Sequence, residues 1–158
     1  MKLRLALLFL GSLPGALLFT GCKTASVSTP VPSPYALSEA VNTEWLLVRW
    51  ISVDGALNPP DEKAPITLQI GEMGRVSGSA GINRYFGNVL IALGALNWND
   101  ALASSRIAGP PALMEREQRY MADLRATRKI SQDSTRLIFT GEGSLLLEFA
   151  NTTPDIRE

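Results

Sequence analysis

The stretch that decides the fold of this chain is RLIFTGEGSLLLEF, residues 136–149. Two runs rich in apolar side chains, 136–140 and 145–149, flank Gly141-Glu142-Gly143, and this pattern predicts a β-hairpin. Alternation along the second run places Leu145, Leu147 and Phe149 on one face, which we expect to face the core. We therefore expect the ordered part of the chain to end in two antiparallel β-strands.

A helical period precedes this hairpin. Proline suits the first turn of a helix, where the N–H that it lacks would have no partner, and Pro110-Pro111 opens the segment. Arg125, Arg128 and Lys129 lie near its far end, where positive charge favours the helix dipole. The residues that recur at helical spacing are Leu113, Glu117, Tyr120, Met121 and Leu124. We expect the principal helix of the chain here.

Strand patterns fill the region before the helix. Residues 45–53 are rich in aromatic and β-branched side chains and end at the turn dipeptide Asp54-Gly55. Residues 66–70 alternate, 71–74 turn the chain and 75–79 return, while 88–93 form another strand and Leu96 begins a weaker one. The fold class is α+β: a mostly antiparallel sheet or partly closed barrel built from hairpins, with one principal helix in the second half.

The first 22 residues predict the cellular localisation of the protein. Lys2 and Arg4 precede an apolar run that ends at Phe19, which is shorter than the roughly 20 residues of a membrane-spanning helix. This layout is typical of a secretory signal peptide, residues 1–21. The sequence LFTGC, residues 18–22, resembles the lipobox of bacterial lipoproteins, although Phe19 stands where leucine is usual. We expect cleavage before Cys22 and attachment of lipid, palmitate included, to its thiol.

Cys22 is the only cysteine of the chain. The alternative to a lipoprotein is an ordinary secreted protein, in which Cys22 would be an unpaired thiol in an oxidising compartment. Two or three acyl chains would instead make an effectively permanent membrane anchor. Lys23 follows where aspartate tends to retain lipoproteins in the inner membrane, so we expect the outer membrane, facing the periplasm.

Composition predicts the remaining organisation. Residues 22–36 are small, hydroxylated and proline-rich, which predicts a disordered, lipid-anchored tether. Residues 37–150 are long enough for one domain. We expect residues 151–158 to form a frayed tail. Without Lys2 and Arg4, the mature chain keeps 13 of its 15 basic residues against 15 acidic ones. The sequence shows no basic stripe, so we expect no nucleic-acid partner.

A family resemblance rests on several segments. Trp45 and residues 66–68 are followed by VSGSAGINRYFG (76–87), SRIAG (105–109), an acidic helix around Glu117 and the closing hairpin. Over about residues 39–150 the chain resembles the META domain of HslJ-type heat-shock lipoproteins. The resemblance implies a non-enzymatic envelope lipoprotein with a structural or stress-response role. The family usually has cysteines where Ile82 and Gly109 stand, and their joint absence is expected if the two thiols act together.

The glycine-rich run admits two interpretations. In the first, its glycines serve turns and Asn83 bonds turn backbone through its amide. In the second, Asn83, Arg84 and Tyr85 form an exposed recognition loop for an envelope protein partner. We expect Trp45, Trp50 and Trp98 in the core or in strand pairs.

The sequence offers little for catalysis. It has no histidine, and its one thiol is assigned to lipid, so Ser-His and Cys-His systems and the usual zinc sets are excluded. Glu115 and Glu117 lie about 200° apart on a helix and do not converge. We expect no enzyme, no catalytic residue, no metal and no cofactor. The alternative to a stress-related role is a lipid-tethered binding module, such as an inhibitor or adaptor of a periplasmic protein.

Overall fold

The computed structural model describes residues 40–98, 102–133 and 135–152. The predictions for the signal peptide, Cys22, most of the tether and most of the tail fall on residues 1–39 and 153–158, outside this part. A short 3-10 turn, η2, covers Glu72–Gly74. The other elements are β1 (Glu44–Ile51), β2 (Thr67–Ile70), β3 (Arg75–Ser79), β4 (Arg84–Ala92), β5 (Ala95–Trp98), β6 (Ala103–Ser104), α1 (Pro111–Ala126), β7 (Thr127–Gln132), β8 (Arg136–Gly141) and β9 (Leu146–Asn151).

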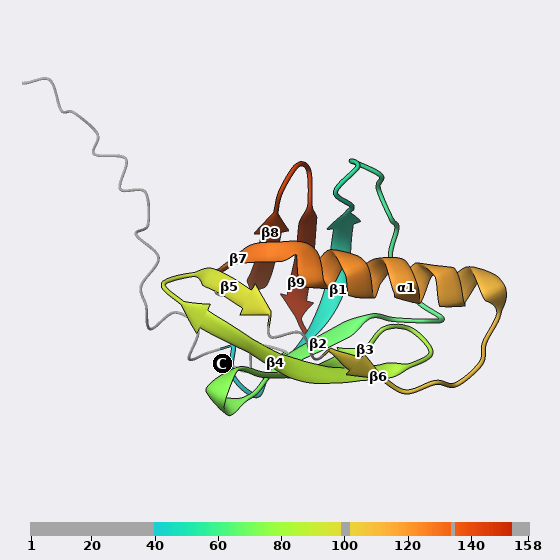
Figure 1. The fold of residues 1–158 in the computed structure, drawn as a ribbon, viewed down its shortest axis with the longest axis horizontal. Coiled ribbons are helices and arrows are strands. Elements are labelled where there is room, and N and C mark those ends of the chain that lie inside the picture. The colour runs from blue at the N-terminus through green and yellow to red at the C-terminus, as the bar shows by residue number, and fades with distance from the viewer. Residues whose placement is uncertain (1–39, 99–101, 134, 153–158) are drawn as a thin grey trace, which may run out of the picture. The chain divides into compact units, whose positions relative to one another are not determined.

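Eight of these strands form a closed antiparallel barrel (Figure 1). The order β3-β2-β1-β9-β8-β7-β5-β4 is joined end to end by pairing between β3 and β4, and the short β6 adds to β4. The predicted α+β class with one principal helix in the second half is confirmed, and the sheet is closed. Closure removes the exposed edges through which open sheets aggregate.

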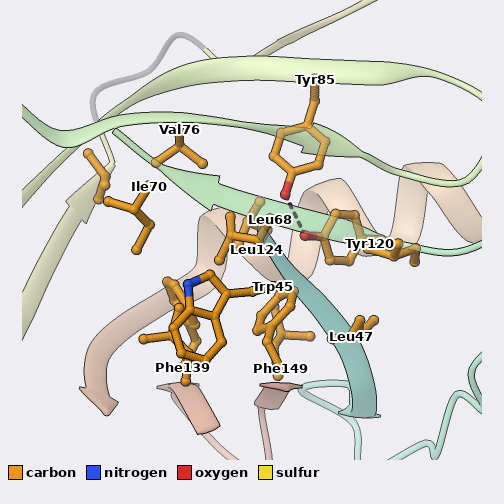
Figure 2. Packing of buried hydrophobic residues seen from close by; sticks show 14 of the residues in the cluster. Trp45, Leu47, Leu68, Ile70, Val76, Tyr85, Tyr120, Leu124, Phe139 and Phe149 are labelled. Carbon is orange, nitrogen blue, oxygen red and sulfur yellow. Dashed lines mark hydrogen bonds between the residues drawn. The ribbon is translucent and has the colours of Figure 1, made fainter. Parts of the chain in front are cut away.

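Helix α1 packs its apolar side into the same core as the barrel. Tyr120, Met121 and Leu124 belong to one buried cluster with the inward side chains of the strands. Figure 2 shows Tyr120 and Leu124 lying among barrel residues that include Tyr85 and Leu68. Fully buried aromatic and branched side chains therefore fill the space between helix and strands.

The tryptophans lie as predicted. Trp45 and Trp50 are core residues, 1% and 0% exposed. Trp98 is half-buried, and its indole N–H donates a hydrogen bond to Oγ1 of Thr127 at 2.9 Å. The prediction of core or strand-pair positions is confirmed.

The closing hairpin also has the predicted register. Arg136 pairs with Ala150 and Phe139 with Leu147. Leu147 and Phe149 are fully buried, and Leu145, just before β9, is 2% exposed. The alternating pattern of residues 136–149 therefore identified the inward face.

Two predicted boundaries are wrong. Strand β4 begins at Arg84, four residues before the predicted start, because Tyr85, Phe86 and Gly87 pair with β3 although glycine is a weak strand former. Helix α1 ends at Ala126, so Arg128 and Lys129 lie in β7, which the sequence reading did not predict. Thr127 leaves the helix in extended conformation while its hydroxyl donates to the carbonyl of Leu124 at 2.8 Å.

Candidate functional site

Asn83 is a buried junction between three parts of the chain. Its side-chain oxygen accepts hydrogen bonds from the Ser105 hydroxyl and the Ile107 N–H, both at 2.7 Å. Its amide donates to the Ile107 carbonyl at 3.1 Å and to Oε2 of Glu117 at 3.2 Å, and its backbone N–H donates to the same oxygen at 3.0 Å. The β3–β4 turn, residues 105–107 and α1 are thus joined at one side chain.

The exposed-loop hypothesis is wrong for Asn83 and Tyr85, which are 0% and 1% exposed. The structural interpretation of Asn83 is the better one. The turn itself is closed by a backbone hydrogen bond from the Ala80 N–H to the Asn83 carbonyl at 2.8 Å. The side-chain amide of Asn83 instead bonds residues 105–107 and α1, beyond its own turn. Arg84 alone of the three is exposed.

Tyr85 is buried against a second tyrosine. The two hydroxyl oxygens of Tyr85 and Tyr120 lie 2.9 Å apart, and the Tyr85 hydroxyl donates to the Thr67 carbonyl at 2.8 Å (Figure 2). Burial raises the pKa of both phenols, and the neighbouring Tyr120 raises that of Tyr85 further. The pair is therefore neutral and structural, and it lies where Gly78 leaves room: a Cβ there would lie 2.8 Å from the Tyr85 hydroxyl.

Ile82 and Gly109 are neighbours in space. A Cβ built on Gly109 would lie 2.0 Å from Cδ1 of Ile82. The isoleucine side chain thus occupies the place into which a side chain at position 109 would point. The family resemblance implies cysteines at these two positions in relatives, whereas this chain has an apolar contact there.

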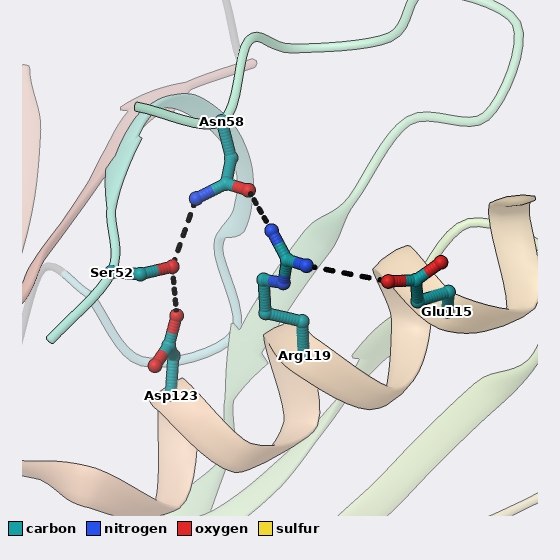
Figure 3. A network of polar contacts seen from close by, with 5 residues as sticks. All are labelled: Ser52, Asn58, Glu115, Arg119 and Asp123. Carbon is teal, nitrogen blue, oxygen red and sulfur yellow. Dashed lines mark hydrogen bonds and ion pairs between the residues drawn. The ribbon is translucent and has the colours of Figure 1, made fainter. Parts of the chain in front are cut away.

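A second polar network surrounds Asp123 on α1 (Figure 3). Its Oδ2 accepts hydrogen bonds from the Trp50 indole N–H at 2.8 Å and the Ser52 hydroxyl at 2.6 Å. Ser52 in turn accepts from the Asn58 amide at 2.9 Å, and the Asn58 oxygen accepts from Arg119 at 3.4 Å. This chain of contacts links the barrel interior to the surface loop of residues 58–63.

That loop and the first half of α1 enclose a surface pocket of about 750 Å³. Arg116 supports its wall: its guanidinium donates to the carbonyl of Ala64 at 3.1 Å and lies 5.9 Å from the centre of the Trp50 ring. Arg119 forms an exposed ion pair with Glu115 at 3.4 Å. The lining residues are Asn58, Pro59, Pro60, Asp61, Glu62, Lys63, Ala112, Glu115, Arg116 and Arg119.

The carboxylates of α1 diverge, as their helical spacing predicts. Glu115 has a side chain 74% exposed, whereas Glu117 is 5% exposed and bound to Asn83. Within residues 40–98, 102–133 and 135–152, no group of three or more histidine, cysteine, aspartate or glutamate side chains is placed to hold a metal ion. No helix in these ranges is long and apolar enough to cross a membrane.

Comparison with known proteins assigns the fold to a family. The META domain matches residues 38–153, a range that includes the whole described part of the chain. The chain belongs to the META domain family. No curated protein matches this META domain chain.

Solved structures share the fold of this META domain. A protein from Burkholderia xenovorans, solved by NMR, has a TM-score of 0.63 at 23% identity, over 89% of this chain and 99% of that one. Another NMR structure has a TM-score of 0.51 at 22% identity, over 72% of this chain and 92% of that one. At these identities the likeness concerns the fold alone.

Local sequence patterns predict neither the pocket nor the Asp123 network. Asn58-Pro59-Pro60-Asp61 is recognisable as a loop, and Arg116 and Arg119 share a helix face by their spacing. The missing information was tertiary: nothing local indicates that this loop folds over that face of the helix.

Proposed function

We propose that this META domain chain is an envelope lipoprotein, acylated at Cys22 and held on the outer membrane facing the periplasm, with a non-enzymatic role under envelope stress. The lipobox-like residues 18–22 and the single cysteine support the anchor. The resemblance to heat-shock lipoproteins supports the stress role.

The observation that carries the non-enzymatic part is the use of the buried acids. Glu117 accepts two hydrogen bonds from Asn83, and Asp123 accepts one each from Trp50 and Ser52. Each carboxylate thereby holds α1 against the barrel, which is a structural use of a group that could otherwise serve as a buried acid or base.

The test of the anchor is a mass measurement with a matched variant. Protein from membranes is expected to carry the mass of a diacylglycerol thioether on Cys22, and Cys22→Ser is expected to appear in the soluble fraction. An unmodified Cys22 in the mature chain would overturn the anchor.

The stress role is tested in cells. A deletion strain is expected to grow poorly under heat or envelope-damaging conditions and to recover with the wild-type gene but not with Cys22→Ser. Glu142→Ala, which removes an exposed acid outside the pocket, is the control and is expected to restore growth. Normal growth of the deletion strain under all these conditions would contradict the proposal.

The 750 Å³ pocket favours a second candidate, a binding module for an envelope protein. Its exposed cations, Lys63 and Arg119, would pair with acidic side chains of the partner. Lys63→Ala/Arg119→Ala is expected to lose a saturable partner in pull-downs from envelope extract, whereas Arg75→Ala, outside the pocket, keeps it. Absence of an enriched partner for the wild type would exclude this candidate under those conditions.

A further inference from the structure

Two exposed turns of the barrel break an ordinary sequence rule. Residues 71–74 join β2 to β3, and Leu93-Gly94 joins β4 to β5. Met73, Gly74, Leu93 and Gly94 all have positive φ: 56°, 73°, 51° and 78°. Positions with positive φ favour glycine, asparagine or aspartate, and a two-residue turn such as Leu93-Gly94 ordinarily has Asn-Gly or Asp-Gly, because large apolar residues reach positive φ only with strain. Gly74 follows the rule, since a Cβ there would lie 2.0 Å from the carbonyl oxygen of Val89.

The first residue of each turn does not follow it. Met73 and Leu93 are 84% and 92% exposed, the highest values among the exposed large apolar residues of the described chain. These two residues therefore stabilise the folded domain neither through a favourable backbone conformation nor through burial of their side chains. Strain combined with apolar exposure at the same two positions indicates that these side chains contact something outside the domain.

Both turns lie at the end of the barrel where the chain enters it, here called the proximal end. Val41 bridges to Ile70, and the Asn42 N–H donates to the Ile70 carbonyl at 2.7 Å. Asn42 and Met73 line the same pocket of about 460 Å³. The start of the described domain and the Met73 turn are therefore adjacent.

Strand β4 carries the second turn to the same end. Arg75 at the start of β3 pairs with Asn88, and β4 continues past that pair to Ala92 and the Leu93 turn. In Figure 1 the β2–β3 turn and the β4–β5 tip both lie on the left, away from the first turn of α1. Leu90, outward-facing on the final part of β4 and 60% exposed, extends the apolar surface.

The occupant of this surface follows from where the chain leads. Residues 23–39, 17 residues in all, separate Cys22 from Ala40, and they span at most about 60 Å when fully extended. A lipid on Cys22 therefore confines the proximal end to the neighbourhood of the bilayer. Such confinement acts as a high effective concentration, so a contact of a few side chains suffices.

We propose that the proximal end of the barrel rests on the membrane surface, with Met73 and Leu93 inserted among the lipid head groups. The proposal rests on the membrane tether of the proposed function. Glu72 and Arg75 flank Met73 with opposite charges, so the contact is apolar in character and largely insensitive to salt. It fixes the orientation of the domain, with the pocket beside α1 facing away from the bilayer.

The experiment couples the mature chain, residues 22–158, through the thiol of Cys22 to a maleimide lipid in nanodiscs that carry a nitroxide lipid. Broadening of ¹³C-methyl NMR signals then reports which side chains lie near the membrane. Met73, Leu90 and Leu93 are expected to lose most of their intensity. Met114 and Leu57, exposed or half-buried at the opposite end, are internal controls and keep theirs.

The matched variant is Met73→Asn/Leu93→Asn. Asparagine suits the positive φ of both turns, so the variant is expected to unfold at the same temperature as the wild type or higher. Its Leu90 signal should no longer broaden more than that of Leu57. Equal broadening at the two ends of the wild type, or unchanged broadening of Leu90 in the variant, would overturn the proposal. In this experiment the lipid is attached chemically, so its outcome does not depend on acylation in cells. If the chain is never acylated in cells, only the mass measurement on Cys22 described above will fail.

Discussion

The carboxylate of Glu117 binds both nitrogens of Asn83, its backbone N–H at 3.0 Å and its amide at 3.2 Å. Asn83 belongs to the β3–β4 turn and Glu117 to α1, 34 residues later. Because both residues are at most 5% exposed, water cannot take the place of a lost hydrogen-bond partner without opening the domain.

Removal of either partner is therefore expected to destabilise the domain. Glu117→Ala leaves the buried N–H of Asn83 without its acceptor, and we expect a loss of about 2–4 kcal/mol in the free energy of unfolding. Denaturant unfolding measures this loss. Glu115→Ala on the same helix removes only an exposed ion pair and is expected to change the free energy by less than about 1 kcal/mol. Equal effects of the two variants would refute the structural role of Glu117.

A disulfide is expected to form when cysteines replace Ile82 and Gly109. The Cβ of residue 109 points at the side chain of residue 82, and a bridge would close a loop of about 28 residues, which stabilises by about 3.5 kcal/mol in the loop-entropy model. In a Cys22→Ser background, Ile82→Cys/Gly109→Cys should lose both free thiols on oxidation and gain stability that reduction reverses. Persistent free thiols under oxidant would show that the backbones are too far apart.

The same contact predicts coupling between the two positions. Gly109→Ala alone places a Cβ against Ile82 and is expected to destabilise by about 1–3 kcal/mol, as overpacking does. In Ile82→Ala the space is free, so adding Gly109→Ala should cost much less. A double-mutant cycle by denaturant unfolding measures the difference, and strict additivity would argue against the contact.

Local patterns predicted the strands and the helix but not how far each extends. Residues 136–149 determine their own hairpin because apolar alternation and a glycine turn agree there. Arg84–Gly87 looked like a loop because glycine and turn-forming neighbours surround Tyr85. Pairing with β3 and burial of Tyr85 against Tyr120 override that local preference.

The candidate site was less predictable for the same physical reason. The sequence predicts that the amide of Asn83 forms hydrogen bonds, but its partners at 105–107 and Glu117 lie 22 to 34 residues away. The pocket needs the 58–63 loop to pack on α1, more than 50 residues along the chain. Sequence spacing identifies the face of a helix and carries no information about which loop covers it.

Alkaline pH is expected to destabilise the domain through its tyrosine pair. Burial raises the pKa of Tyr85 and Tyr120 above the usual value near 10, so above pH 10 the unfolded chain releases protons that the folded chain retains. The free energy of unfolding should thus be unaffected by these groups below pH 10 and should fall as pH rises above it. Denaturant unfolding from pH 8 to 11 measures this fall.

The matched variant for this pH dependence is Tyr85→Phe/Tyr120→Phe. It loses the bond to the Thr67 carbonyl and is expected to be less stable at pH 8 by about 1–3 kcal/mol. Its free energy of unfolding should fall less steeply above pH 10 than that of the wild type. Parallel curves would mean that the two phenols are not the source of the alkaline loss.

Asp123 is expected to control the order of the pocket loop, although it lies inside the domain. It accepts bonds from Trp50 and Ser52, and Ser52 positions Asn58, the first residue of the loop 58–63. Asp123→Ala leaves the indole N–H and the hydroxyl without their acceptor, so the free energy of unfolding should fall by about 2–4 kcal/mol. Backbone amides of the loop should also exchange faster with deuterium, beyond what global destabilisation explains.

The control is Asp123→Asn, which keeps an acceptor oxygen and should retain most of the loop protection. Glu117→Ala is a second control, because it destabilises α1 without contacting Ser52 or Asn58. If both alanine variants speed exchange of the loop equally, protection reflects overall stability alone. If only Asp123→Ala does so, the hydrogen-bond chain from Asp123 through Ser52 to Asn58 sets the shape of the pocket, and ligands of the pocket should in turn slow exchange at the Trp50 indole.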